Sequence, residues 1–247
     1  MNTMTDTPNW EYDDIAKMID HALLTPSMTR DDLEAGIRLA KLFNVASVCI
    51  LPYYVGRCAE LLADSSVLPS TVIGFPHGGQ ATAVKAFEAR TAIEDGCQEL
   101  DMVVNISAVL SDEWEQVTAD IRAVIEPAHA ADRQVKVIFE NCYLRQSHKI
   151  RLCEICNELG ADWIKTSTGF GASGATIDDL RLMLEHARGA VQVKAAGGIR
   201  DLETVLKARE LGVTRVGASK TADILNECRR RLNLEPYEVS SCGPTGY

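Results

Sequence analysis

Residues 161–170 read ADWIKTSTGF and residues 191–200 read VQVKAAGGIR. Each segment begins with a short run rich in apolar and β-branched residues, which is typical of a β-strand, and ends in a turn that contains glycine. Thr176, which lies between the two runs, is a good N-cap for a helix. The two runs are therefore predicted to be adjacent parallel strands, about 5 Å apart, joined by a helix.

The same unit of strand and helix repeats along the chain. Eight such units with no linker between halves, and no G-x-G-x-x-G after the first strand, favour a closed barrel over an open doubly wound sheet. We expect an α/β fold, a TIM (β/α)8 barrel, as a single domain over residues 15–231, with a short N-terminal extension at 1–14 and a mobile C-terminal tail at 232–247. The expected strands are residues 19–23, 46–51, 71–75, 100–105, 135–139, 163–166, 191–195 and 214–218, with helical patterns such as 29–43, 81–95, 112–131 and 144–159 between them.

Composition excludes several classes of protein. Hydrophobic residues at 46% and charged residues at 24% are ordinary for a globular chain, and the net charge of −10 argues against general affinity for nucleic acid or an anionic membrane. Residues 1–10 contain no signal-like segment, and no apolar run is long enough to span a membrane, so we expect a cytoplasmic protein. The eight cysteines lack the spacing of a disulfide framework, and Cys153 and Cys156 fall in a helical pattern with no second pair to complete a metal site.

Alternation along the strands places charged side chains inside the barrel. Apolar side chains on one face of each strand belong under the helices, which leaves the opposite set to face the lumen. These lumen residues lie mostly near the C-terminal ends of their strands, where barrel active sites are built, although a purely structural ion-pair network is the alternative. The lumen set is Cys49, Asp101, Lys136, Lys165 and Lys194.

Lys165 and Lys194 are one strand-helix unit apart and come from neighbouring strands. Two ammonium groups that face one cavity repel each other, which favours loss of one proton and leaves a neutral amine able to attack a carbonyl. Either lysine alone is also compatible with a solvated strand end. As a pair in the lumen, they predict Schiff-base chemistry.

Glycine-containing turns follow the last three strands. Glycine lets backbone N–H groups approach an anion closely, and the loops after strands seven and eight are a frequent phosphate site in this architecture. We therefore predict a phosphate site at Gly169, Gly197, Gly198, Gly217 and Ser219.

With these residues in view, the chain resembles the deoxyribose-phosphate aldolase family between residues 15 and 220. The resemblance implies a class I aldolase that reversibly cleaves 2-deoxy-D-ribose 5-phosphate to acetaldehyde and D-glyceraldehyde 3-phosphate in deoxyribose phosphate catabolism, with no metal and no cofactor. The matching segments, in chain order, are Asp20-His21-x-Leu23-Leu24, Val48-Cys49, GFP (74–76), ELDMVVN (99–105), KVIFE (136–140), WIKTSTGF (163–170), KAAGGIR (194–200) and VGAS (216–219).

The resemblance also implies roles for particular residues. Lys165 is the expected nucleophile, Lys194 the lysine that lowers its pKa, and Asp101 a proton relay that acts through water. The final residue, Tyr247, is expected to take part in proton transfer at C2 of the substrate. Further substrate contacts are expected from Asp20, Cys49, Lys136 and Thr168.

Three positions depart from the family pattern. Ala22 stands where threonine is common, Phe170 where some members place a lysine near the phosphate, and Lys220 where a second serine is common. Phosphate recognition is therefore expected to differ in detail, and Lys220 is either a phosphate contact or simply exposed.

Other functions stay open from the residues alone. They are a different class I barrel aldolase acting on a phosphosugar, and a non-catalytic phosphosugar-binding protein. A metal-dependent aldolase is disfavoured because the five histidines show no ligand spacing. The expected partners are phosphosugars and aldehydes, and the sequence is compatible with a homodimer.

Overall fold

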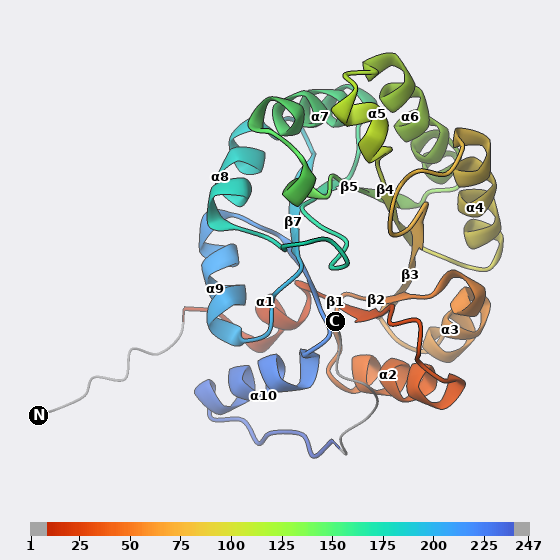
Figure 1. Cartoon of the computed structure of the whole chain (residues 1–247). Coiled ribbons are helices and arrows are strands. Elements are labelled where there is room, and N and C mark those ends of the chain that lie inside the picture. Colours follow the sequence, from red (N-terminus) through yellow and green to blue (C-terminus); the bar gives the residue numbers. More distant parts are fainter. Residues whose placement is uncertain (1–8, 240–247) are drawn as a thin grey trace, which may run out of the picture.

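Eight parallel strands close into a barrel in chain order, with β1 paired to β8, in a computed structural model that describes residues 9–239 (Figure 1). The TIM-barrel prediction is confirmed, and the expected strands lie within three residues of the observed ones. The largest difference is β3, which begins at Leu68 and ends at Ile73. The strands are β1 (Ile19–Leu23), β2 (Ser47–Ile50), β3 (Leu68–Ile73), β4 (Glu99–Val103), β5 (Gln134–Ile138), β6 (Trp163–Lys165), β7 (Gln192–Ala196) and β8 (Arg215–Ala218).

Helices surround the barrel, as Figure 1 shows. A helix follows every strand, and two short helices were not expected: α1 (Tyr12–Ala16), which falls at the end of the predicted extension and buries Ile15 and Ala16, and α5 (Ile106–Leu110) after β4. Short 3-10 turns, η1 (Pro52–Tyr54) and η2 (Asn141–Tyr143), follow β2 and β5. The main helices are α2 (Arg30–Leu42), α3 (Val55–Leu62), α4 (Thr82–Glu94), α6 (Trp114–Ala130), α7 (Gln146–Leu159), α8 (Ile177–His186), α9 (Leu202–Leu211) and α10 (Thr221–Arg231).

Local signals in the sequence set the helix ends. The side chain of Thr29 accepts a hydrogen bond from the backbone N–H of Asp32 and so caps α2, and Thr176 caps α8 through Asp179 in the same way. Helix α7 ends at Gly160, whose φ of 69° lies in the left-handed region that favours glycine. These caps orient each helix for the turn back to the next strand.

Strand side chains alternate between two different environments. The outward set, exemplified by Val137, Ile164 and Val193, is buried in one core between the barrel and the helices. The inward set carries the charges: Asp101 pairs with Lys136 in the β4–β5 register, and Lys165 pairs with Lys194 in the β6–β7 register. The structure therefore places these four side chains at neighbouring levels of the lumen.

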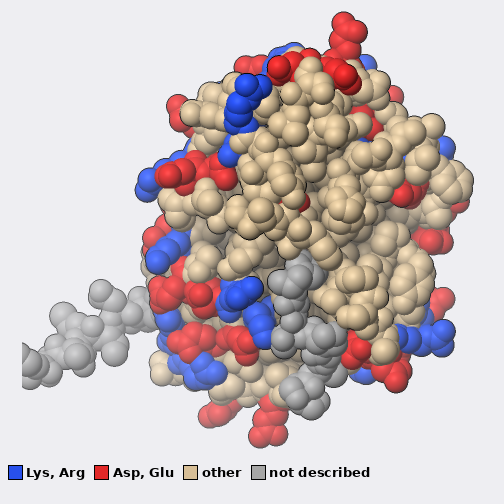
Figure 2. Space-filling model, in the orientation of Figure 1, with Lys and Arg blue, Asp and Glu red and all other residues tan. Residues whose placement is uncertain are grey.

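Most charged side chains lie toward the outside of the molecule. In the face shown in Figure 2, lysine, arginine, aspartate and glutamate gather mainly around the periphery. In the part of the chain that the structure describes, no helix is long and apolar enough to cross a membrane.

The first part of the predicted tail packs against the barrel. Asn226 of α10 exchanges two hydrogen bonds with the backbone of Tyr237, and the Tyr237 ring lies edge-on to Phe43 with 5.2 Å between centroids. The Arg229 guanidinium lies over the Tyr237 ring, 3.9 Å from its centroid. Residues 232–239 thus have fixed contacts although they were expected to be mobile, and the proposed domain bounds rest on the sequence pattern alone.

A buried ion pair joins two helices to the end of β4. Lys85 of α4 donates to Asp120 of α6 at 2.5 Å and to the carbonyl of Val103 at 2.8 Å, and both charged side chains are almost completely excluded from solvent. Thr82 donates to the second oxygen of Asp120. The pair fixes α4, α6 and the strand that carries Asp101.

Replacing Asp120 with Ala should destabilise the fold by about 3–5 kcal/mol, because the Lys85 charge would stay buried without its partner. Urea unfolding followed by far-UV circular dichroism measures this difference. The matched control is Asp64→Ala, which removes the carboxylate of an exposed pair with Lys41 and should leave the midpoint nearly unchanged. Equal midpoints for the two variants would contradict this account.

Candidate active site

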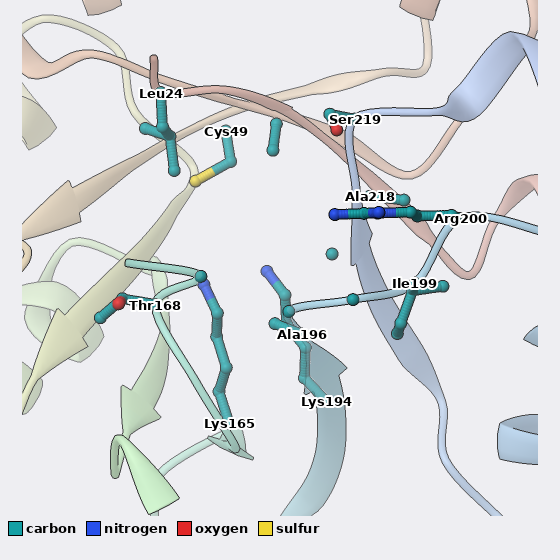
Figure 3. A pocket seen from close by; sticks show the side chains of 15 residues that line it. Leu24, Cys49, Lys165, Thr168, Lys194, Ala196, Ile199, Arg200, Ala218 and Ser219 are labelled. Carbon is teal, nitrogen blue, oxygen red and sulfur yellow. The ribbon is translucent and has the colours of Figure 1, made fainter. Parts of the chain in front are cut away.

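A cavity opens at the C-terminal ends of the strands, where β1, β2, β6, β7 and β8 and the loops after them meet. Figure 3 shows Lys165 and Lys194 reaching up into it side by side, with Cys49 and Leu24 across from them. The cavity is lined by Ala22, Leu24, Cys49, Lys165, Thr168, Gly169, Lys194, Ala196, Gly197, Gly198, Ile199, Arg200, Gly217, Ala218 and Ser219.

One carboxylate is shared by three lysines below this cavity. Asp101 Oδ2 accepts a hydrogen bond from Lys165 Nζ and another from Lys194 Nζ, each at 2.7 Å. Asp101 Oδ1 accepts a third from Lys136 Nζ at 3.0 Å. All four residues are buried, and Lys165 is the most exposed of them at only 3%.

A second layer of charges lies deeper in the lumen. Glu99 accepts hydrogen bonds from Lys136 and Arg215, each at 2.6 Å, and Arg215 also donates to Asp20. Lys194 Nζ lies 2.5 Å from the other oxygen of Asp20. Sequence reasoning missed Glu99 and Arg215. Glu99 has the same parity as Asp101 but lay outside the expected strand, and Arg215 was inside its strand without being recognised as a lumen charge.

The two cavity lysines have opposite pKa shifts. Burial removes the Lys165 ammonium from water and lowers its pKa; Asp101 opposes this effect, and Lys194 adds to it. Burial also opposes the charge of Lys194, but Asp101 and Asp20 together outweigh it and raise the Lys194 pKa. The predicted repulsion between the lysines is therefore present, but burial is the larger cause.

Lys165 consequently loses its proton more readily and is the better nucleophile, whereas Lys194 stays an ammonium group. Burial opposes ionisation of Asp101, yet the three lysines together hold its pKa well below the usual range, so it remains a carboxylate. The arrangement combines an amine whose pKa is lowered, an ammonium group and a carboxylate within hydrogen-bonding reach of one another. These are the groups needed to form an imine and to move its protons.

The glycine turns form part of the cavity wall. The predicted residues Gly169, Gly197, Gly198, Gly217 and Ser219 all line it. The φ angles of Gly169, Gly197 and Gly198 lie between 80° and 92°, where a side chain would strain the backbone. Arg200, which sequence reasoning missed, lines the same wall, and its guanidinium reaches toward the cavity in Figure 3. The sequence could have indicated this role, because Arg200 directly follows Gly197-Gly198-Ile199 in a turn predicted to bind phosphate.

A comparison with models of protein families agrees with the chemistry expected of this site. Residues 15–220 match the model of the DeoC/LacD family aldolases. The chain belongs to the DeoC/LacD aldolase family. This result confirms the family expected from the sequence motifs, and the protein is an aldolase.

Individual members of this aldolase family cover almost the whole chain. A deoxyribose-phosphate aldolase from Rhodopirellula baltica is 58% identical over 97% of this chain and 99% of its own length. One from Carboxydothermus hydrogenoformans is 46% identical over 85% of this chain and 93% of its own. A solved deoxyribose phosphate aldolase from Aeropyrum pernix superposes with a TM-score of 0.82 at 29% identity, covering 89% of this chain and 92% of that one.

The other residues predicted for this aldolase site are not all at the cavity surface. Cys49 and Thr168 line it, whereas Asp20 and Lys136 lie in the deeper layer and reach the cavity only through Lys194 and Asp101. Burial, followed by the Asp101 charge, raises the pKa of the Cys49 thiol to about 11, so this thiol is protonated at neutral pH.

Three further positions bear on the expected phosphate and proton-transfer groups. Lys220 is not among the described residues that line the cavity. Phe170 stands edge-on to Phe75, with 5.3 Å between ring centroids, beside an apolar neighbouring pocket. Tyr247 lies outside the described residues.

Glu140 supports the turn that carries Gly169. Its carboxylate accepts hydrogen bonds from the backbone N–H and the hydroxyl of Thr168, and that hydroxyl accepts one from Phe170 N–H. Burial raises the pKa of Glu140, although Thr168 opposes this shift. The shared parity of Lys136 and Glu140 was visible in the sequence, but the left-handed backbone of Glu140 at φ 57° was not.

Proposed function

We propose that this protein is a class I aldolase that reversibly cleaves 2-deoxy-D-ribose 5-phosphate into acetaldehyde and D-glyceraldehyde 3-phosphate. The observation that carries the proposal is the pair of cavity lysines bonded to a single oxygen of Asp101, of which only Lys165 has a lowered pKa. The name of the Rhodopirellula baltica relative supports the same substrate. The reaction would serve deoxyribose phosphate catabolism.

Lys165 acts as the nucleophile in this scheme. Its neutral amine adds to C1 of the open-chain sugar and forms a carbinolamine. Lys194, whose ammonium group lines the cavity, donates a proton to the departing C1 oxygen, which leaves as water. The product is an iminium ion that joins C1 to Lys165.

The iminium ion then withdraws electrons from the C2–C3 bond. When the C3 hydroxyl loses its proton, this bond breaks, C3 becomes the aldehyde of D-glyceraldehyde 3-phosphate, and the electrons remain as an enamine at C1 and C2. Asp101 is completely buried behind the two lysines, so it receives the proton through Lys194 or water. Protonation of C2 and hydrolysis of the iminium ion release acetaldehyde and restore Lys165.

The glycine wall binds the phosphate of the substrate. Backbone N–H groups at Gly197 and Gly198 and the hydroxyl of Ser219 can each donate a hydrogen bond to a phosphate oxygen, and the Arg200 guanidinium can neutralise its charge. Lys165 and these turns line one cavity, which suits a sugar with C1 at Lys165 and its phosphate at the glycine turns.

We also propose a cytoplasmic location and a homodimer. The seven described cysteines are free, and the cytosol would keep them reduced. On α4, Phe87 is 64% exposed and Val84 is 46% exposed, and residues three positions apart lie on the same side of a helix. The Aeropyrum pernix relative is described as a tetramer.

If α4 forms the dimer contact, Phe87→Glu should convert a dimer into a monomer without loss of secondary structure, because the new charge would be buried in the interface. Sedimentation velocity measures the change. An exposed apolar residue at another place, Tyr53, gives the control variant Tyr53→Glu. A monomeric wild type, or a Phe87→Glu variant that remains dimeric, would contradict the proposed contact.

Lys165 should carry the covalent intermediate. Incubation with acetaldehyde, reduction with borohydride and peptide mapping by mass spectrometry should place the adduct on Lys165. Lys165→Ala should lower kcat for cleavage by several orders of magnitude, since no other group supplies the electron sink. The control is Lys149→Ala, which alters a lysine of α7 that is paired with Asp179. An adduct mapped to Lys194 would refute the assignment.

Lys194 should help to keep Lys165 neutral. In Lys194→Leu, Asp101 would lose one cation and hold the remaining Lys165 ammonium more strongly, so the Lys165 pKa should rise toward about 10.4. Cleavage should fall at neutral pH and recover partly in alkali. A pH–rate profile with the wild-type shape at lower height would show instead that Lys194 acts only by position or proton donation.

A further inference from the structure

Arg215 and Glu99 form an ion pair that has no role in the proposed chemistry. The Arg215 side chain lies over the Trp163 ring, 4.9 Å from its centroid, and its guanidinium donates to both Glu99 and Asp20. Glu99 is completely buried, and it also accepts the hydrogen bond from Lys136. Neither residue is among the described residues that line the cavity.

Both residues nevertheless connect to the reacting amine by short chains of contacts. From Arg215 the chain runs through Asp20 and Lys194 to Asp101, and Asp101 holds Lys165. From Glu99 a second chain runs through Lys136 to the other oxygen of Asp101. A change of charge at the bottom of the lumen therefore alters which cation Asp101 neutralises at the top.

The charges around Lys165 come from almost every strand of the barrel. Cys49 is a protonated thiol at neutral pH, and Glu140 is bonded to Thr168 beyond the end of β5. Strand β3 has the sequence LPSTVI and contributes no titratable side chain. Arg200 lines the same cavity as Lys165, outside the described ion pairs. The ion-paired groups are Asp20 from β1, Glu99 and Asp101 from β4, Lys136 from β5, Lys194 from β7 and Arg215 from β8.

The ion-paired groups below the cavity balance when Lys165 is uncharged. Three carboxylates then meet the three cations Lys136, Lys194 and Arg215 in one continuous set of ion pairs. A protonated Lys165 adds a fourth cation to the same three carboxylates. An excess charge is costly in a lumen from which water is largely excluded.

We propose that Arg215 and Glu99 are positioning residues that set the charge balance of the lumen and thereby the proton affinity of the Lys165 amine: Arg215 favours its neutral form and Glu99 its charged form. Arg215 is the third cation of the lumen beside Lys136 and Lys194. It pairs with Asp20, so that Asp20 does not draw Lys194 away from Asp101. Glu99 acts in the opposite sense, because it draws part of the Lys136 charge away from Asp101. The inference rests on the proposed function, since it explains how that reaction obtains its nucleophile.

Two substitutions should move the pH dependence in opposite directions. Arg215→Met removes a cation, so the acid limb of the kcat/KM profile should shift to higher pH by roughly one unit, which is about a tenfold loss of neutral amine at a fixed pH on that limb. Glu99→Gln removes a negative charge, so the limb should shift to lower pH. The double variant should return the limb to near its wild-type position.

Arg215→Lys is the matched control. It keeps the charge but loses the two-pronged guanidinium, so the limb should stay in place even where the maximal rate falls. Circular dichroism establishes that each variant is folded. If Arg215→Met does not fold, Glu99→Gln and the double variant decide the result. The inference would be overturned if the variants had a lower maximal kcat/KM with an acid limb at the wild-type pH. It would also be overturned if Arg215→Met and Glu99→Gln both moved the limb in the same direction.

The same variants are tested by borohydride trapping of acetaldehyde as a function of pH. This measurement depends on the neutral amine and not on cleavage of deoxyribose 5-phosphate. A wild-type protein that traps acetaldehyde at Lys165 but does not cleave the phosphosugar would refute the proposed substrate alone. Opposite shifts in trapping would still support the charge balance, and unshifted trapping would refute it.

Discussion

The Asp101 carboxylate accepts hydrogen bonds from Lys136, Lys165 and Lys194 in a lumen where none of these residues is more than 3% exposed. A carboxylate so placed stays ionised because lysines surround it, and the charged lysines are tolerated there because of the carboxylates. The protonation states of the site are therefore a property of the whole group. Lys165 differs from its neighbours because Asp101 is its only carboxylate partner among the described ion pairs, while Lys136 and Lys194 each contact Asp20 as well.

The barrel makes this arrangement possible by separating two environments. Residues such as Val137, Ile164 and Val193 point outward into the apolar core, and the alternate positions on the same strands point inward. Helices α4 and α6, joined by Lys85 and Asp120, cover the strand that carries Asp101. The outer core can hold the strands in register, so that the lumen charges need not supply the stability of the fold.

Sequence reasoning found the inward charges because alternation along a strand needs only local information. It located Asp101, Lys136, Lys165 and Lys194, and it expected the glycine wall from loop position alone. It missed Glu99 because the expected strand began one residue too late. It could not find the Arg215–Glu99 contact, which joins residues 116 positions apart in the chain. The direction of the Lys194 pKa shift could not be predicted from the sequence either, because it depends on whether the charges of Asp101 and Asp20 outweigh the effect of burial. Contacts of Tyr237 with Phe43 were hidden in a segment without periodicity.

Buried ion pairs are often no more stabilising than well-packed apolar side chains of similar volume. Leucine and valine side chains would fill the lumen and stabilise the barrel equally well, as the layers of branched residues in many such barrels show. The network of ion pairs is therefore better explained by chemistry than by folding; its seven members are Asp20, Glu99, Asp101, Lys136, Lys165, Lys194 and Arg215. Removing water makes each charge interact more strongly with its neighbours, and this coupling lets distant residues influence one amine. The physical condition that makes the lumen costly to build is the same one that gives Lys165 a proton affinity unlike that of a lysine in water.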